Sequence, residues 1–345
     1  MKISMAVNYS GDVKAMADQV VEYEKAGVDL VWVAEAYGMD APTVMGYLAA
    51  VTDTVEIASG ILPIYSRTPT LLAMTAVGVD VLSNGRCMLG LGASGPQVIE
   101  GFHGVTYDAP LGRTREIVEI CRKIWKREDK LQHDGKYYQM PLREGEGTGL
   151  GKPLKIITHP PRPDIPILLA SLGHKNVALT AEIADCWLPT LFVPDKASMV
   201  WGEDLDRGYA KRDASLGTMD IMAGGMLAIG KQDEVEQYRE YGRGTTALYV
   251  GGMGAKGKNF YNNVFSRYGW EAEAHSIQEL YLDGHKTEAE AAIPSEFLEK
   301  SSLIGDEGYV KERLDAYAEA GVTYLNVAPV GPDPVGTVRK LKELL

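Results

Sequence analysis

The chain has 345 residues, of which 45% are hydrophobic, so it can bury a large core without disulfides or metals. Its formal charge is 35 − 47 = −12, which disfavours nucleic acid and anionic lipid as partners. Cys87, Cys121 and Cys186 show no Cys-x-x-Cys spacing, and we expect buried thiols in a reducing compartment. No run approaches the ~18 apolar residues of a membrane helix, and residues 1–7 are too short and mixed for a signal peptide. We therefore expect a cytoplasmic protein outside the membrane.

Short apolar runs alternate with amphipathic segments along the chain. The first helix is expected from residue 13, where apolar side chains recur at i, i+3, i+4, i+7 and i+8, and Gly27 ends it. Eight strands are expected, at 2–7, 30–34, 55–62, 86–91, 167–170, 185–189, 220–229 and 323–329. Further helices are expected at 41–51, 70–82, 113–126, 175–184, from 194, at 233–241, at 310–320 and at the C-terminus.

Strands that alternate with helices predict a parallel sheet, and eight such units predict a closed (β/α)8 TIM barrel. We expect one domain over residues 1–345, with two excursions from the pattern at about 129–166 and 251–302. The first excursion is rich in proline, glycine and glutamate. Residues 23–34 and 317–328 repeat one helix–glycine–strand unit, which supports the alternating architecture.

Barrels place their sites at the carboxyl ends of the strands. This rule selects candidates that follow the expected strands: Asn8, Tyr9, Glu35, Gly60, Ile61, Gly92, Ala93, Ser94, Gly95, Ser171, Leu172, Gly173, His174, 188–190 and Pro329.

Two glycine motifs do not fit the folds they formally match. Residues 90–95 read Gly-x-Gly-x-x-Gly, but three βα units precede them and no second strand ends in an acidic residue about 20 positions on, so a glycine-rich turn is favoured over a dinucleotide site. Residues 252–258 match Gly-x-x-x-x-Gly-Lys, but Asn259 replaces the Ser or Thr that would bind magnesium. We expect a loop there that could contact an anion through Lys256 and Lys258.

Several segments read together resemble the luciferase-like monooxygenase superfamily. They are 60–69 (GILPIYSRTP), 82–92 (LSNGRCMLGLG), 181–185 (AEIAD) and 303–306 (LIGD), the last leading into 312–314 (ERL) and 320–322 (AGV). The similarity spans nearly the whole chain. Within the superfamily, 251–254 (GGMG), 259–261 (NFY) and Leu172-Gly173 resemble the branch that uses the deazaflavin coenzyme F420.

The resemblance implies an F420-dependent oxidoreductase that transfers a hydride to or from a small organic substrate, and a homodimer. It implies a non-proline cis peptide at Gly60-Ile61, in a bulge that backs the coenzyme ring; the alternative is an ordinary glycine turn. Residues Glu35-Ala36 and Gly95 depart from the pattern of relatives that oxidise a sugar phosphate, so that substrate is not expected.

Three side chains are candidates for acid–base work. Glu35 ends a buried strand and could orient the ring or move a proton, or it could form a salt bridge with a neighbour such as Arg67. Tyr9 and His103 are secondary candidates, and His103 could equally be a surface imidazole. The histidines show no metal-ligand spacing, so no metal is expected.

The turn 171–174 joins a strand to a helix N-terminus, which suits the phosphate of the coenzyme tail. The alternative for Ser171 is helix capping alone. Two rival functions remain open: an FMN-dependent monooxygenase of the same fold, and a non-catalytic protein that binds flavin or deazaflavin.

Overall fold

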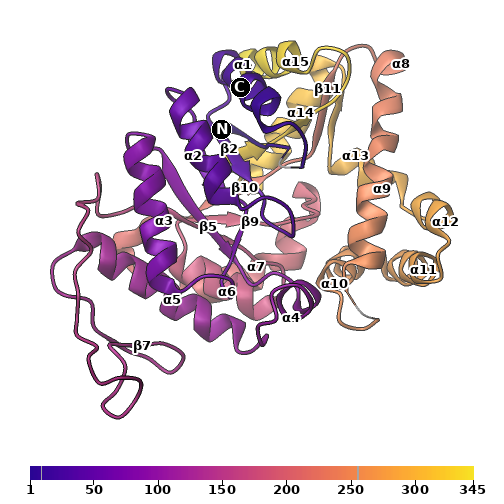
Figure 1. Ribbon diagram of the computed structural model, residues 1–345. Helices are drawn as coiled ribbons and strands as arrows, with labels where there is room; N and C mark the ends of the chain where they lie inside the picture. The colour runs from indigo at the N-terminus through magenta and orange to yellow at the C-terminus, as the bar shows by residue number, and fades with distance from the viewer. Residues whose placement is uncertain (9, 255) are drawn as a thin grey trace.

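The computed structural model describes residues 1–8, 10–254 and 256–345. Eight parallel strands form a barrel in the order β3-β2-β1-β13-β10-β9-β8-β5, which closes because β3 also pairs with β5 (Figure 1). The strands are β1 (Lys2–Ala6), β2 (Leu30–Val33), β3 (Glu56–Ser59), β5 (Cys87–Gly92), β8 (Ile167–Ala170), β9 (Cys186–Leu188), β10 (Asp220–Ala223) and β13 (Tyr324–Asn326). The expected (β/α)8 barrel is confirmed.

Helices cover the outside of the barrel. They are α1 (Val13–Ala26), α2 (Ala41–Val51), α3 (Pro69–Leu82), α5 (Pro110–Lys126), α6 (His174–Ile183), α7 (Ala197–Tyr209), α14 (Glu307–Glu319) and α15 (Pro334–Leu344). Asp12, Asp40 and Thr68 cap α1, α2 and α3 by accepting from backbone N–H groups, and Asp306 caps α14 in the same way. Such caps satisfy backbone N–H groups at the start of each of these helices.

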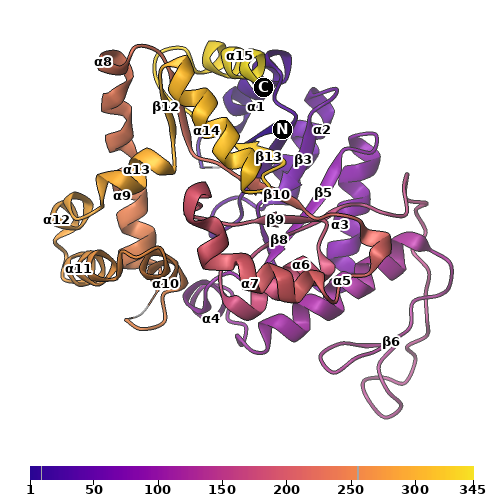
Figure 2. The same cartoon turned by 180° about the vertical axis from the view of Figure 1, so that it is seen from behind.

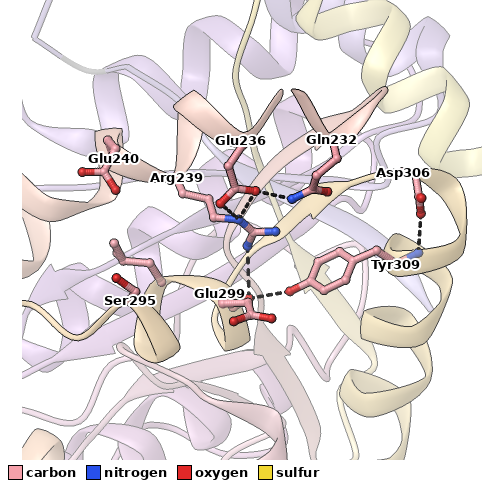
Figure 3. A pocket seen from close by; sticks show the side chains of 9 residues that line it. Gln232, Glu236, Arg239, Glu240, Ser295, Glu299, Asp306 and Tyr309 are labelled. Carbon is pink, nitrogen blue, oxygen red and sulfur yellow. Dashed lines mark hydrogen bonds and ion pairs between the residues drawn. The ribbon is translucent and has the colours of Figure 1, made fainter. Parts of the chain in front are cut away.

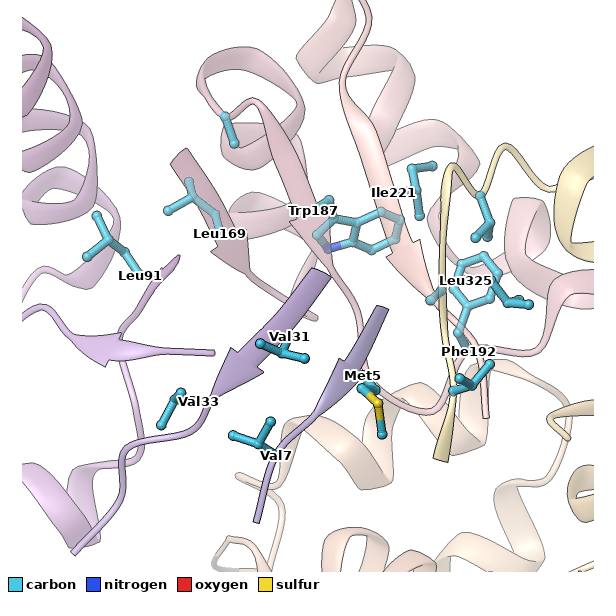
Figure 4. Close-up of a cluster of buried hydrophobic side chains, with 14 of the residues drawn as sticks. Met5, Val7, Val31, Val33, Leu91, Leu169, Trp187, Phe192, Ile221 and Leu325 are labelled. Carbon is cyan, nitrogen blue, oxygen red and sulfur yellow. The ribbon is translucent and has the colours of Figure 1, made fainter. Parts of the chain in front are cut away.

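Alternation along the strands builds two apolar layers. Outward side chains pack against the helices, and Figure 4 shows Val31, Leu169 and Ile221 among them, from three different strands. Inward side chains such as Leu30, Met88 and Leu168 fill the barrel interior. The three cysteines are buried, as expected.

Three of the expected strands are interrupted. The run 55–62 divides at Gly60-Ile61 into β3 and β4 (Leu62–Pro63), and the run 323–329 divides at Val327 into β13 and β14. The run 220–229 divides at Gly224-Gly225, where an added Cβ would lie 2.2 Å from the Asn326 carbonyl oxygen or 1.9 Å from that of Ser301. Beyond the break, β11 (Met226–Ile229) leaves the barrel and pairs with β12 (Leu303–Gly305) and β14 (Ala328–Pro329). The sequence predicted one long strand at each place because both halves are apolar, and it missed β12.

The two excursions have different structures. Residues 129–166 form a two-stranded antiparallel ladder, β6 (His133–Asp134) with β7 (Gln139–Met140), on a segment that projects from the barrel (Figure 2). The second excursion is mostly helical: α10 (Phe260–Arg267), α11 (Glu271–Leu282), α12 (Lys286–Ala291) and α13 (Ser295–Lys300). A helical run from α8 (Gln232–Val235) through η3 (Glu236–Tyr241), α9 (Gly242–Ala247) and η4 (Leu248–Gly252) leads into it. Within the described residues, no helix is long and apolar enough to cross a bilayer.

Candidate active site

The barrel interior is closed at one end and open at the other. At the amino end of the strands, Lys2 Nζ lies 2.7 Å from Glu56 Oε1, and the Tyr324 hydroxyl donates to Glu56 Oε2 at 2.9 Å. At the carboxyl end Ala6 points into the interior and is exposed, although Met5 and Val7 on either side of it are buried. The accessible part of the barrel is therefore its carboxyl mouth, where barrels place their sites.

Trp32 lies at this mouth and was not predicted as a site residue. Its indole Nε1 donates to Asn326 Oδ1 at 2.9 Å, and its ring lies against Gly60, where an added Cβ would come within 2.2 Å of Cε3. The signal was present in the parity of β2, because Leu30 and Trp32 point inward while Val31 and Val33 point outward. The uninterrupted apolar run 30–34 instead predicts a strand that is buried on both faces.

The peptide bond between Gly60 and Ile61 is cis, as expected. Both residues are partly exposed, whereas Ser59 before them and Leu62 after them are buried. The Ile61 side chain in turn covers Gly92, where an added Cβ would lie 2.9 Å from Ile61 Cγ1. The bulge is thus the accessible part of this strand, and Trp32 supports it from within the barrel.

The turn after β5 is the neighbouring accessible segment. Gly92 is buried at the end of the strand, but Ala93, Ser94 and Gly95 are partly exposed. Ser94 adopts a left-handed conformation with φ of 57°, and Gly95 is the N-cap of the short helix α4 (Pro96–Gly101). This glycine motif follows β5, which pairs with β3 and β8 in the closed barrel, and not the first strand of an open dinucleotide-binding sheet.

Glu35 forms the salt bridge that was the alternative to an acid–base role. Its Oε1 lies 2.5 Å from Arg67 Nη1 and its Oε2 lies 2.9 Å from Arg67 Nη2. Oε2 also accepts from the Ala41 N–H, at the start of α2, at 2.8 Å. Both carboxylate oxygens are therefore engaged in joining β2, α2 and the segment before α3.

In the turn Ser171–His174 after β8, the polar groups of Ser171 already have hydrogen-bond partners within the fold. The Ser171 hydroxyl is buried and lies 2.8 Å from Thr180 Oγ1, while the Ser171 carbonyl accepts from Trp187 Nε1 at 3.0 Å. Leu172 and Gly173 are partly exposed, and Gly173 is the N-cap of α6. An anion at this helix end would therefore meet backbone N–H groups rather than the Ser171 side chain.

Basic side chains gather beside the same helix end. His174 is exposed, and its Nδ1 lies 2.8 Å from the buried carboxylate of Asp204. Asp204 also pairs with Arg207, and Arg267 donates to the carbonyls of Val200 at 2.9 Å and Leu172 at 3.1 Å. Burial lowers the pKa of Arg267, with Asp204 opposing that change.

The remaining predicted residues lie apart or outside the described part. His103 follows α4, its ring packs edge-on against Phe102 at 5.2 Å, and its buried Nε2 has no hydrogen-bond partner among the described residues. Tyr9 lies outside the described residues. The structure brings Glu35, the Gly60-Ile61 bulge, the 92–95 turn and the 171–174 turn to the ends of four consecutive strands, β2, β3, β5 and β8.

A separate hollow of about 530 Å³ lies outside the barrel, between the 232–240 segment, α13 and the start of α14 (Figure 3). Four carboxylates line it, from Glu236, Glu240, Glu299 and Asp306. Its guanidinium, Arg239, is buried, pairs with Glu236 and donates to Ser302 Oγ at 2.9 Å. These contacts, with a further hydrogen bond from Arg239 to the Ile304 carbonyl, join η3 to β12. The described residues contain no group of three or more His, Cys, Asp or Glu placed to hold a metal.

The closed barrel, which is accessible at the carboxyl ends of its strands, makes this chain a (β/α)8-barrel protein. The luciferase-like monooxygenase family model matches residues 1–324, and the chain belongs to that family. A Mycobacterium tuberculosis protein, named provisionally as a coenzyme F420-dependent oxidoreductase, is 41% identical over 95% of this chain and 94% of its own. The 5,10-methylenetetrahydromethanopterin reductase of Archaeoglobus fulgidus is 27% identical over 93% of this chain and 92% of its own.

Solved structures agree on the fold. The coenzyme F420-dependent tetrahydromethanopterin reductase of Methanopyrus kandleri superposes with a TM-score of 0.79 at 20% identity, covering 100% of this chain and 98% of that one. An FMN-bound Baeyer–Villiger monooxygenase component of Pseudomonas putida superposes with a TM-score of 0.64 at 17% identity, covering 98% and 96%. The same architecture thus occurs with both coenzymes.

Proposed function

We propose that this protein is an F420-dependent oxidoreductase that transfers a hydride between the deazaflavin and a small organic substrate. The observation that carries the proposal is that two features lie at the same mouth. One is an apolar platform made by Trp32 and the Gly60-Ile61 bulge at the end of β3. The other is a helix N-terminus at Gly173, two strands away from β3 in the barrel. A coenzyme with a planar ring and an anionic tail needs both features. The 41% identical relative named for F420 supports the choice of coenzyme.

The residues present fit such a coenzyme. The bulge and the 93–95 turn are partly exposed next to one another, so a planar ring can lie against backbone and the Ile61 side chain. The first turn of α6 contains no acidic residue and begins His174-Lys175, both exposed, which favours a phosphate there. Phe260 of α10 lies against Gly173, where an added Cβ would be 3.2 Å from its Cε1. A side chain at Gly173 would therefore crowd the approach to this helix end.

When bound, a deazaflavin supplies a hydride carrier, since carbon replaces the flavin N5 and reaction with oxygen is poor. The chain supplies position and electrostatics. The Glu35–Arg67 pair fixes the loop after β2, and Trp32 fixes the bulge from below. We propose Glu35 as the first candidate for transferring the accompanying proton, with His103 and Tyr9 as the other two candidates.

The proposal is tested by turnover without oxygen. We expect purified protein with reduced F420 to reduce at least one member of a panel of aldehydes, ketones and α,β-unsaturated ketones under nitrogen, with deuterium from labelled coenzyme appearing in the product. Turnover only with reduced FMN and oxygen would establish the monooxygenase alternative. Tight coenzyme binding with no turnover in either assay would favour a non-catalytic carrier.

We also propose a homodimer through the outer face of α2 and α3, which pack against each other. The exposed or partly exposed positions of this face are Thr43, Gly46, Tyr47, Ala50, Val51, Thr70, Leu71, Met74, Thr75, Gly78, Val81 and Leu82, none of them charged. The one charged residue of both helices, Asp80, is buried and pairs with Arg162 at 2.8 Å. Contiguous apolar patches of roughly 300–600 Å² are often functional on a soluble protein. In a chain of net charge −12, an uncharged face is where two copies can meet without repulsion.

A further inference from the structure

Two exposed aromatic side chains meet at the barrel mouth from different loops. Tyr37, in the loop after β2, is 70% exposed, and Phe102, directly after α4, is 64% exposed. Their ring centroids are 6.1 Å apart. Strands β2 and β5 lie on either side of β3, so these loops flank the Gly60-Ile61 bulge. Large apolar side chains left in water beside a candidate site mark a surface that a ligand covers.

The surroundings of this pair extend its apolar character. Met39 and Val105, in the same two loops, are 42% and 38% exposed. Next to them lie the partly exposed Trp32 and Ile61, which belong to the platform assigned to the coenzyme ring. The only polar group of Trp32, its indole N–H, already donates to Asn326. Apart from the Tyr37 hydroxyl, these side chains thus present rings and aliphatic groups to the mouth.

The charges on this side argue against an anionic ligand. Segments 34–40 and 93–109 contain no lysine or arginine, and they contain Glu35, Asp40, Glu100 and Asp108. The nearest arginines are already neutralised: Arg67 pairs with Glu35, and Arg113 Nη2 lies 2.9 Å from Asp108 Oδ1. A carboxylate or phosphate on this side would lose hydration without gaining a cation.

We infer that the substrate is a neutral compound with an apolar ring, which packs against the exposed Tyr37–Phe102 pair beside the Gly60-Ile61 bulge. The inference rests on the proposed function, because it assigns the anionic coenzyme tail to the 171–174 turn after β8 and the substrate to the loops after β2 and β5, which contain no lysine or arginine. Stacking on two rings supplies shape selectivity, since aromatic pairs favour particular offset or edge-on arrangements. Polar sugars, phosphates and carboxylates are excluded as substrates by the same surface.

A matched pair of probes tests the inference. 2-Acetylnaphthalene is neutral and 2-naphthoate is anionic, while their ring systems are identical. We expect calorimetric titration of the full-length protein to give at least about tenfold tighter binding of 2-acetylnaphthalene, with or without F420. Equal affinities, or tighter binding of 2-naphthoate, would overturn the inference.

Variants locate the binding. Phe102→Ser should weaken 2-acetylnaphthalene binding at least about fivefold, because the exposed ring contributes contact but little to the fold. Tyr241→Ser is the control. Tyr241 is 63% exposed, its ring centroid lies 5.6 Å from that of Tyr238, and it belongs to η3 and not to the loops after β2 and β5. Tyr37→Ser provides a second variant at the proposed position. Unchanged binding in both mouth variants, with melting temperatures preserved, would place the ligand elsewhere.

The outcome is separable from that of the coenzyme proposal. If the probe binds as expected but F420 does not bind, the apolar substrate site stands and the coenzyme assignment fails. If F420 binds but the probe shows no preference for the neutral form, the coenzyme assignment stands and the substrate inference fails.

Discussion

At the scale of single residues, one substitution separates the observed structural role of Glu35 from its proposed acid–base role. Glu35→Gln removes the charge that pairs with Arg67, whose side chain is 13% exposed, so we expect a loss of roughly 3 kcal/mol in unfolding free energy. An acid–base role would add a loss of about 10²-fold or more in kcat. Denaturant unfolding and saturated anaerobic turnover measure the two effects. Stability loss with kcat within about tenfold of wild type would make Glu35 a positioning residue only.

The control for that experiment is an exposed pair. Arg143 Nη2 lies 3.0 Å from Asp134 Oδ1, with side chains 59% and 79% exposed. Exposed pairs contribute about 0–1 kcal/mol, so Asp134→Asn should change neither stability nor turnover appreciably. If it destabilises as much as Glu35→Gln, burial is not the cause of the Glu35 effect.

Gly60 provides the second test at this scale. A Cβ there would come within 2.2 Å of the Trp32 ring, so Gly60→Ala must displace the indole or the bulge. We expect F420 affinity to fall at least about tenfold, or 1.4 kcal/mol, in a fluorescence titration. Gly101→Ala is the control, since nothing lies within 4 Å of a Cβ at that position. An unchanged affinity for Gly60→Ala would show that the bulge does not support the coenzyme.

The sequence predicted the positions of the candidate site better than their contacts. Strand ends could be counted from periodicity, which selected Glu35, Gly60-Ile61 and 171–174. The hydrogen-bond partners of these residues could not be predicted from periodicity. The Ser171 hydroxyl bonds to Thr180 and the Trp32 indole to Asn326 only because of how the folded segments pack. Trp32 was missed because an apolar strand looks alike on both faces in sequence.

At the scale of elements, one carboxylate joins α1 to the loop before β3. Glu24 accepts from the N–H groups of Asp53, Thr54 and Val55. Burial alone would raise the pKa of Glu24, but these hydrogen bonds lower it below its ordinary value near 4.5. A lowered folded-state pKa means that the stabilisation is complete above that ordinary value and is lost as pH falls through the folded pKa.

Glu24→Gln should therefore destabilise the protein at pH 7 and much less near pH 3. Denaturant unfolding at the two pH values measures this difference. Glu22→Gln is the control, because Glu22 is 55% exposed and pairs only with Lys25 on the same helix. A pH-independent difference between wild type and Glu24→Gln would mean that the ionised form is not what the loop requires.

The elements of the barrel itself were predictable, whereas the excursions were not. All eight barrel strands lie where apolar runs predicted them, since parallel strands buried on both faces leave a strong signal. The break at Gly224-Gly225 was not predicted, because it depends on close approach to Asn326 and Ser301. The short helices α4, α10, α12 and α13, and α11 beside them, were not predicted, because the segments that contain them lack the long periodic stretches that predict a helix reliably.

At the scale of the whole molecule, the uncharged face of α2 and α3 predicts a dimer. Met74 is 54% exposed on that face, so Met74→Glu should introduce a charge into the interface and shift the protein to monomer. Met199→Glu is the matched control, because Met199 is 62% exposed on α7. Sedimentation velocity at micromolar concentration measures the result. A wild-type monomer, or a dimer that survives Met74→Glu but not Met199→Glu, would contradict the proposed face.

The most direct test of the central proposal is a parallel titration of the wild-type protein with F420 and with FMN, followed by coenzyme fluorescence. The platform at Trp32 and the Gly60-Ile61 bulge, with the anion-favouring end of α6, suits a planar ring with an anionic tail. The 41% identity with a relative named for F420 leads us to expect saturable F420 binding at least about tenfold tighter than FMN binding. Tighter binding of FMN, or no saturable binding of F420, would contradict it.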